Sequence, residues 1–152
     1  MRPPPVFVLL APLLTACSGA LAVPRPPSRS EAVPLILAEV LTYEVRQFGE
    51  TVEGPLEVCL AVREDGAIKD PSASMMQRLA DRKDVKPQSA CGSQASIALV
   101  AGPIEWLAAD EVRVRGSYTR RTLRASTALT YRVVWEGGRW VCLGPVVSLD
   151  PL

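Results

Sequence analysis

The segment YRVVWEGGRWVC, residues 131–142, decides how the second half of the chain folds. Two adjacent glycines, Gly137 and Gly138, separate two β-type runs, and glycine readily supplies the positive φ angles of a tight two-residue turn. The pattern therefore predicts a β-hairpin whose tryptophans serve as packing residues; a carbohydrate platform is the less favoured interpretation. The register set by this turn predicts three facing pairs on one side of the sheet: Trp135 with Trp140, Val133 with Cys142, and Tyr131 with Gly144.

Further strands are predicted upstream of this hairpin. Apolar and polar residues alternate over residues 56–63, as they do in a strand with one buried face. The remaining strand candidates are residues 96–101, 104–107, 111–119, 128–135 and 139–147.

Two helices are predicted in the first half of the chain. Apolar residues recur at helical spacing over residues 34–48, with Pro34 suited to the first position and Gly49 to the stop. A second, short helix is expected to begin at the capping residue Asp70 and to end near Arg82. It would bury Met75 or Met76 together with Leu79.

These elements predict an α+β fold. We expect two helices packed on a curved, mainly antiparallel sheet of four to six strands. This roll is similar to cystatin-like and NTF2-like folds at the level of architecture, and such a similarity implies no function. Residues 34–152 are expected to form a single domain, because 152 residues are too few for two comfortable cores.

Composition argues against several kinds of function. The chain contains no histidine, which removes the most common general base and metal ligand. The chain has 17 basic and 16 acidic residues, and removing residues 1–16 takes away Arg2 and no acid, which leaves 16 of each. A neutral chain has no overall field to attract nucleic acid. We therefore predict no catalytic residue, no metal site, no cofactor and no nucleic-acid partner.

The N-terminus has the pattern of an export signal. One arginine and a proline cluster precede an apolar run of 11 residues, 6–16. A membrane-spanning helix needs about 20 residues, whereas this shorter run is typical of a signal peptide. Residues 14–17, Leu-Thr-Ala-Cys, resemble the lipobox of bacterial lipoproteins. The resemblance implies cleavage after a signal peptide of residues 1–16 and acyl chains on Cys17; simple secretion, with cleavage after Ala22, is the alternative.

The same resemblance implies a location in the cell envelope. The protein would face the periplasm or the exterior and be held on the lipid bilayer by its N-terminal acyl chains. Ser18, rather than aspartate, follows the lipidated cysteine, which implies the outer membrane in a Gram-negative cell. Residues 17–33, rich in proline and small residues, are then predicted to be a lipidated, extended tether.

Three further cysteines leave room for one disulfide and one free thiol. Cys142 falls in the middle of a predicted strand, whereas Cys91 lies in a loop that is free to reach a neighbour. This placement favours a Cys59–Cys91 disulfide, with the other pairings left open. Several short motifs also resemble exported bacterial proteins of unknown function, over roughly residues 55–148: Val58-Cys59-Leu60, Asp70-Pro71-Ser72, Ser89-Ala90-Cys91, Trp106 with Asp110-Glu111-Val112, and the Gly-Gly-Arg-Trp hairpin. That resemblance supports the fold and a disulfide and brings no activity.

Fourteen of the basic residues are arginines, and five of them are close together in sequence. Arg113 and Arg115 are predicted on one face of a strand. The connection that follows carries a possible anion-binding cluster, since guanidinium groups bind carboxylates and phosphates in bidentate fashion. The favoured alternative is a solvated surface with acids nearby. The residues of the possible cluster are Arg120, Arg121 and Arg124.

We expect the domain to be a non-enzymatic binding or accessory module that contacts an unidentified envelope protein or a small ligand. One alternative is a small envelope hydrolase or ligand-processing enzyme that uses the carboxylates Glu105, Asp110 and Glu111. A second alternative is a secreted inhibitor or immunity-type protein with an exposed apolar patch.

Overall fold

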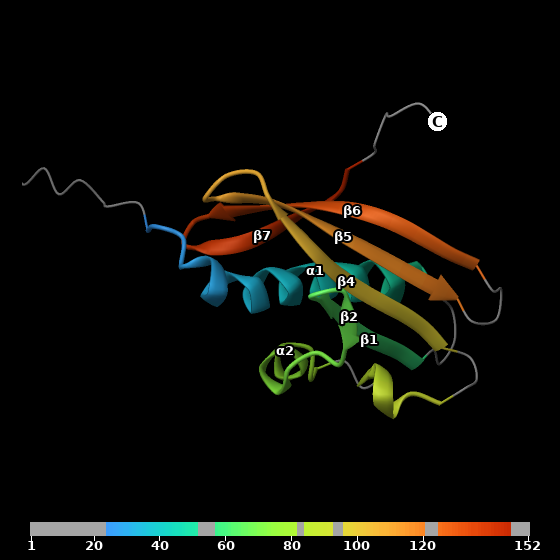
Figure 1. Ribbon diagram of the computed structural model, residues 1–152. Coiled ribbons are helices and arrows are strands. Elements are labelled where there is room, and N and C mark those ends of the chain that lie inside the picture. Colours follow the sequence, from blue (N-terminus) through green and yellow to red (C-terminus); the bar gives the residue numbers. More distant parts are fainter. Residues whose placement is uncertain (1–23, 52–56, 82–83, 93–95, 121–124, 147–152) are drawn as a thin grey trace, which may run out of the picture.

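The computed structural model describes residues 24–51, 57–81, 84–92, 96–120 and 125–146 (Figure 1). Helix α1 lies along one face of a sheet, and the short helix α2 lies beyond the β1 edge (Figure 1). The elements in chain order are α1 (Arg29–Thr51), β1 (Glu57–Glu64), β2 (Ala67–Lys69), α2 (Ala73–Arg78), β3 (Val85–Pro87), the 3₁₀ helix η1 (Gln88–Ala90), β4 (Ser96–Trp106), β5 (Glu111–Arg120), β6 (Ala125–Glu136) and β7 (Arg139–Pro145).

The seven strands found in the described residues form one open sheet, in the order β2-β1-β4-β5-β6-β7, with β3 paired to β1. Strand β1 runs parallel to β3 and β4, and the other pairings are antiparallel. The predicted α+β class is confirmed, but the strand count exceeds the expected four to six. The additional strands β2 and β3 have three residues each, which is too short to produce a period-two pattern.

Helix α1 begins five residues before the predicted start, so Pro34 lies inside the helix and the last part of the predicted tether is helical. The Glu31 side chain caps the start of α1, because its carboxylate accepts hydrogen bonds from the Ser28 hydroxyl and, at 3.1 Å, from the Ser28 backbone N–H, which is one half of a capping box. The serine–glutamate spacing that marks this start was present in the sequence. Among the described residues, no helix combines the length and apolar character needed to cross a bilayer.

Helix α2 is also capped differently from the prediction. Ser72, not Asp70, is the N-cap, and its hydroxyl accepts a hydrogen bond from the Met75 backbone N–H at 3.3 Å. The helix ends at Arg78, earlier than expected. Met75 and Leu79 are buried, as predicted.

The hairpin of β6 and β7 has the predicted turn, and Trp135 faces Trp140 while Val133 faces Cys142. The third predicted pair is wrong, because a register shift between Arg132 and Val133 pairs Tyr131 with Pro145. Gly144 falls at this irregularity with a φ of +105°, and a Cβ there would lie 2.8 Å from the Tyr43 hydroxyl. The positive φ therefore favours glycine at this position, and the Tyr43 hydroxyl leaves little room for a side chain.

Residues 96–101 and 104–107, predicted as separate strands, belong mostly to one strand, β4, which carries a register shift between Ala101 and Ile104. Gly102 lies within the shift with a φ of +106°, and a Cβ there would come within 2.4 Å of the Arg63 carbonyl oxygen. Only glycine fits where β4 passes the end of β1.

The hydrophobic core fills the space between α1 and the inner face of the sheet. Each strand from β4 to β6 contributes fully buried aliphatic side chains, and β1 does so through its middle residues. The largest such residues are Ile36, Leu37, Val40 and Leu41 from α1, and Leu60, Ile97, Leu99, Val112, Val114 and Val133 from the sheet.

Candidate functional site

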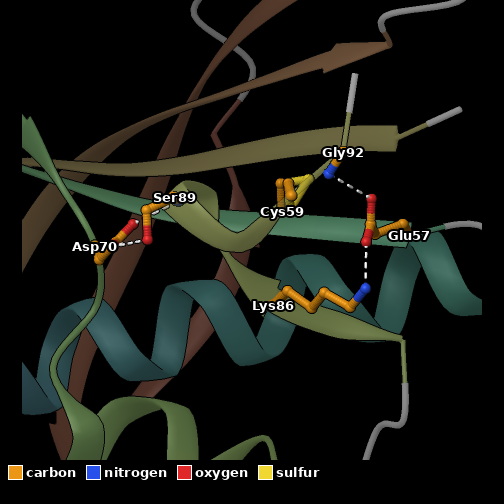
Figure 2. Close-up of a disulfide and its surroundings, with 7 residues drawn as sticks. Glu57, Cys59, Asp70, Lys86, Ser89 and Gly92 are labelled. Carbon is orange, nitrogen blue, oxygen red and sulfur yellow. Dashed lines mark hydrogen bonds and ion pairs between the residues drawn. A yellow bond between two sulfur atoms is a disulfide. The ribbon is translucent and has the colours of Figure 1, made fainter. Parts of the chain in front are cut away.

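Of the predicted site residues, Cys59 and Cys91 are joined in a disulfide, with their Cα atoms 6.0 Å apart (Figure 2). This confirms the predicted pairing and leaves Cys142 as a half-buried free thiol, whose pKa burial raises to about 11. Cys17, the predicted lipidation site, lies outside the described residues.

Polar contacts surround the disulfide. The Glu57 carboxylate pairs with the Lys86 ammonium group and accepts a hydrogen bond from the Gly92 backbone N–H at 3.2 Å (Figure 2). Close by, the Ser89 backbone N–H and hydroxyl both donate to Asp70, which lowers the pKa of that carboxyl (Figure 2).

We call residues 57–59, 70 and 85–92 the disulfide flank. Here the disulfide and the polar contacts hold η1 and the short strand β3 against β1. Its carboxylate and sulfur atoms at Glu57, Cys59 and Cys91 lie close enough together to resemble a metal site. The two sulfurs are bonded to each other, however, so neither is a thiolate ligand. The arrangement is therefore a structural clamp.

The predicted arginine cluster is described only at Arg120, a half-buried residue that ends β5; Arg121 and Arg124 lie outside the described residues. Arg113 and Arg115 are exposed on one face of β5, as predicted. Acids accompany them, because Arg113 lies opposite Glu105 in the neighbouring strand. On its other side, Arg113 lies opposite Arg132 of β6, so the anion-binding interpretation of the cluster stays a prediction.

The three acids considered for a catalytic role do not line the groove described next. Glu111 accepts a hydrogen bond from Arg132 Nε at 2.8 Å. Glu105 is exposed opposite Arg113, and Asp110 lies in the connection between β4 and β5.

An open groove of about 590 Å³ lies between the first half of α1, the turn between β1 and β2, and the later part of β4. The sharp bend of the turn uses positive φ at Asp65 and Gly66. The walls of the groove combine apolar and charged side chains. The apolar ones include Val33, Ile104 and Trp106, and the charged ones are Arg63, Glu64 and Asp65. Sequence patterns did not identify this groove, because its walls come from three segments that are distant in the chain.

The N-terminal segment is attached to the hairpin beside this groove. The Trp135 indole N–H donates to the Pro24 carbonyl oxygen at 2.8 Å, and the Pro24 ring lies over Gly138. The Arg29 guanidinium carbon is 5.0 Å from the centre of the Trp106 ring, which is a cation–π distance. Residues 24–28, predicted as tether, thus lie against the folded domain.

Glu44 is a buried acid in the interface between α1 and the sheet, with 1% of its surface exposed. Neither carboxyl oxygen has a hydrogen-bond partner of acceptable geometry. Burial raises the pKa of Glu44 from 4.5 to about 8, and the nearby Tyr131 hydroxyl opposes part of this shift. Space for the carboxyl exists because Gly116 has no side chain; a Cβ there would lie 2.9 Å from Glu44 Oε1.

Other polar groups face Glu44 from the elements packed around it. Burial and the adjacent carboxyl raise the pKa of Tyr131, which lies on β6. The Tyr43 ring packs edge-on against the Tyr131 ring at 5.8 Å, and Cys142 approaches from β7. Glu44 is not part of the groove wall, so we interpret it as a titratable core residue rather than a ligand-binding residue.

Comparison with known proteins yields no match to any family model, curated protein or solved structure.

Proposed function

We propose that the chain is the precursor of an exported lipoprotein whose folded domain is a non-enzymatic binding module of the cell envelope. Cleavage before Cys17 and acylation of that residue would anchor the mature protein, as the lipobox-like sequence implies. The Cys59–Cys91 disulfide supports export, because disulfides persist in oxidising compartments and are rare in the cytosol.

The groove beside Trp106 is the observation that carries the binding function. Its volume of about 590 Å³ falls within the range of small-molecule sites and also accommodates a short extended segment of a partner protein. Trp106 and Ile104 offer apolar contact area, while Arg63 and Asp65 offer one charge of each sign. Such a surface suits a ligand that has both an apolar part and polar groups.

The fold supports a scaffold role for the domain. A long helix packed on one face of a sheet is consistent with the roll architecture of cystatin-like and NTF2-like folds, which we retain as a proposal at that level only. In such a scaffold the groove is built on rigid elements, and only the turn at Asp65 belongs to a loop.

Photo-crosslinking in the native host tests the groove. A benzophenone amino acid replaces Ser30, an exposed residue of the groove wall, or Arg113, an exposed residue on β5 that does not line the groove. We expect the first position to yield one discrete adduct that the groove-filling substitution Val33→Trp abolishes. Equal adduct patterns at both positions, or adducts that persist in Val33→Trp, would contradict the proposal.

Fractionation of cells tests the anchor. Wild-type protein should sediment with membranes, and Cys17→Ala should not, because the thioether-linked lipid cannot form. Cys142→Ala is the matched control, since it removes a thiol without touching the proposed lipidation site. Membrane association that survives Cys17→Ala would contradict acylation as the means of attachment.

A further inference from the structure

All three tryptophans of the chain gather at one end of the molecule. The Trp140 ring is edge-on to both others, at 5.9 Å from Trp106 and 5.6 Å from Trp135. The start of α1, the connection between β4 and β5, and the turn between β6 and β7 lie together here (Figure 1). We call this region the tryptophan end and define it by residues 24–29, 106–110 and 135–140.

The chain enters the domain at this same end. Pro24 is fixed to the hairpin by the hydrogen bond from Trp135, and the contact of Ser28 with the Glu31 carboxylate then caps the start of α1. Helix α1 has 23 residues, so it extends about 34 Å away from the tryptophan end at 1.5 Å per residue. The far end of α1 therefore lies about 34 Å along the helix from the end where the chain leaves the domain toward Cys17.

Chain length limits how far the tryptophan end can lie from the anchor. Seven residue steps separate Cys17 from Pro24, and fully extended chain spans at most about 25 Å over that length. If residues 17–33 were all free tether, as the sequence predicts, the limit would be more than twice as large. Attachment at Pro24 thus keeps this end of the domain close to the acyl chains.

The surface chemistry of the tryptophan end suits the interfacial region of a bilayer. Trp106 and Trp135 are half-buried, and Leu107 is 43% exposed. Tryptophan is enriched at membrane interfaces because its ring is apolar and its N–H is polar. Exposed charges of both signs accompany these residues: Arg25, Arg29 and Arg139, with Asp110 and Glu136.

Resting on the proposed lipidation of Cys17, we infer that the tryptophan end lies against the lipid bilayer and that the Trp106 groove opens beside the membrane surface. The contact is made by apolar and aromatic side chains and not by net charge. Ligand would consequently reach the groove along the membrane rather than from the opposite end of the domain.

Native tryptophan fluorescence tests this inference without added labels. Lipoprotein purified from its host is reconstituted in phosphatidylethanolamine vesicles that contain brominated lipid, with and without phosphatidylglycerol. Bromine quenches tryptophan only at short range, so we expect strong quenching that is insensitive to salt and to anionic lipid. Cys17→Ser protein mixed with the same vesicles should show little quenching.

Two surface substitutions separate membrane contact from mere tethering. Leu107→Glu should reduce the quenching by about half, because it removes apolar contact at the interface. Val146→Glu is the matched control: Val146 is 41% exposed and lies beyond the end of β7, away from the hairpin turn. Circular dichroism of both variants checks that the fold is retained.

The outcomes distinguish the inference from the proposed function. Acylated protein whose tryptophans are no more quenched than those of Cys17→Ser would overturn the membrane contact and leave the anchor intact. Equal quenching of Leu107→Glu and Val146→Glu would also overturn it. Absence of lipid on Cys17 in the host-purified protein would overturn the proposed function itself.

Discussion

Acidic side chains play opposite roles in the helix-covered core and in the disulfide flank. In the core, Glu44 is almost completely enclosed, so burial favours its neutral form. In the flank, Asp70 is exposed and accepts two hydrogen bonds from Ser89, so its charged form is favoured. Burial and hydrogen bonding therefore shift two carboxyl groups of one small domain in opposite directions.

The same two regions differ in what holds them together. The core rests on long antiparallel strands and on the apolar face of α1. The disulfide flank rests on a three-residue strand, a covalent bond and polar contacts near the surface. A region with little apolar surface to bury thus obtains its stability from a crosslink.

The largest expected effect concerns Glu44. Its pKa in the folded protein, about 8, lies above the ordinary 4.5, so the folded state retains a proton that the unfolded chain releases. The protonated Glu44 therefore contributes its full stabilisation below pH 4.5, and this contribution is lost as the pH rises through about 8. The free energy of unfolding should change by roughly 3–5 kcal/mol over that range. Glu44→Gln should abolish that pH dependence in urea unfolding.

Glu39→Gln is the matched control for this experiment. Glu39 lies on the same helix, is half-exposed and pairs with Arg78 at 3.9 Å. An exposed ion pair of this kind contributes at most about 1 kcal/mol. If Glu44→Gln and Glu39→Gln had the same pH profile of stability, Glu44 would not be a buried neutral acid.

The next effect concerns the crosslink of the flank. The disulfide spans 32 residues, and loop-closure entropy assigns it about 3.7 kcal/mol. The double substitution Cys59→Ala and Cys91→Ala should lower the free energy of unfolding by about this amount, and reductant should then have no further effect. The control variant Cys142→Ala keeps the disulfide, so reductant should still lower its free energy of unfolding. A double variant as stable as the wild type would show that polar contacts alone hold the flank.

The smallest effect has the opposite sign to that of Glu44. The Ser89 hydrogen bonds lower the pKa of Asp70, so their stabilisation is present above the ordinary pKa of aspartate and is lost on acidification. Asp70→Asn should therefore weaken the fold slightly at neutral pH and not at low pH. Thermal unfolding at both pH values measures this, and a larger loss at low pH would refute the assigned contact.

The sequence predicted the core better than the flank, for physical reasons that particular residues show. The Gly137-Gly138 turn determined the hairpin because two-residue turns constrain register locally. The pairing of Tyr131 failed because the strands carry an irregularity at Gly144, and a lone glycine in a strand pattern does not fix the register. Strand β3 is held by pairing to β1, a tertiary contact without a local signal.

The candidate sites do not follow this division. The Cys59–Cys91 pair was predictable because strand and loop placement restrict which thiols can meet. The groove was not, since Val33, Asp65 and Trp106 come together only when the register of β1 and β4 is known. The burial of Glu44 had a local signal, because Glu44 follows Val40 by four residues and Leu41 by three and so lies on the apolar face of the helix. Its charge argues against burial, and sequence reasoning missed it for that reason.

Mass spectrometry of the intact protein, purified from the membranes of its native host, tests the central claim most directly. We predict a mature chain that begins at Cys17 and carries diacylglycerol on the cysteine sulfur. We also expect one alkylatable thiol, at Cys142, before reduction. A chain that begins at another residue, or a free thiol at Cys17, would contradict the account.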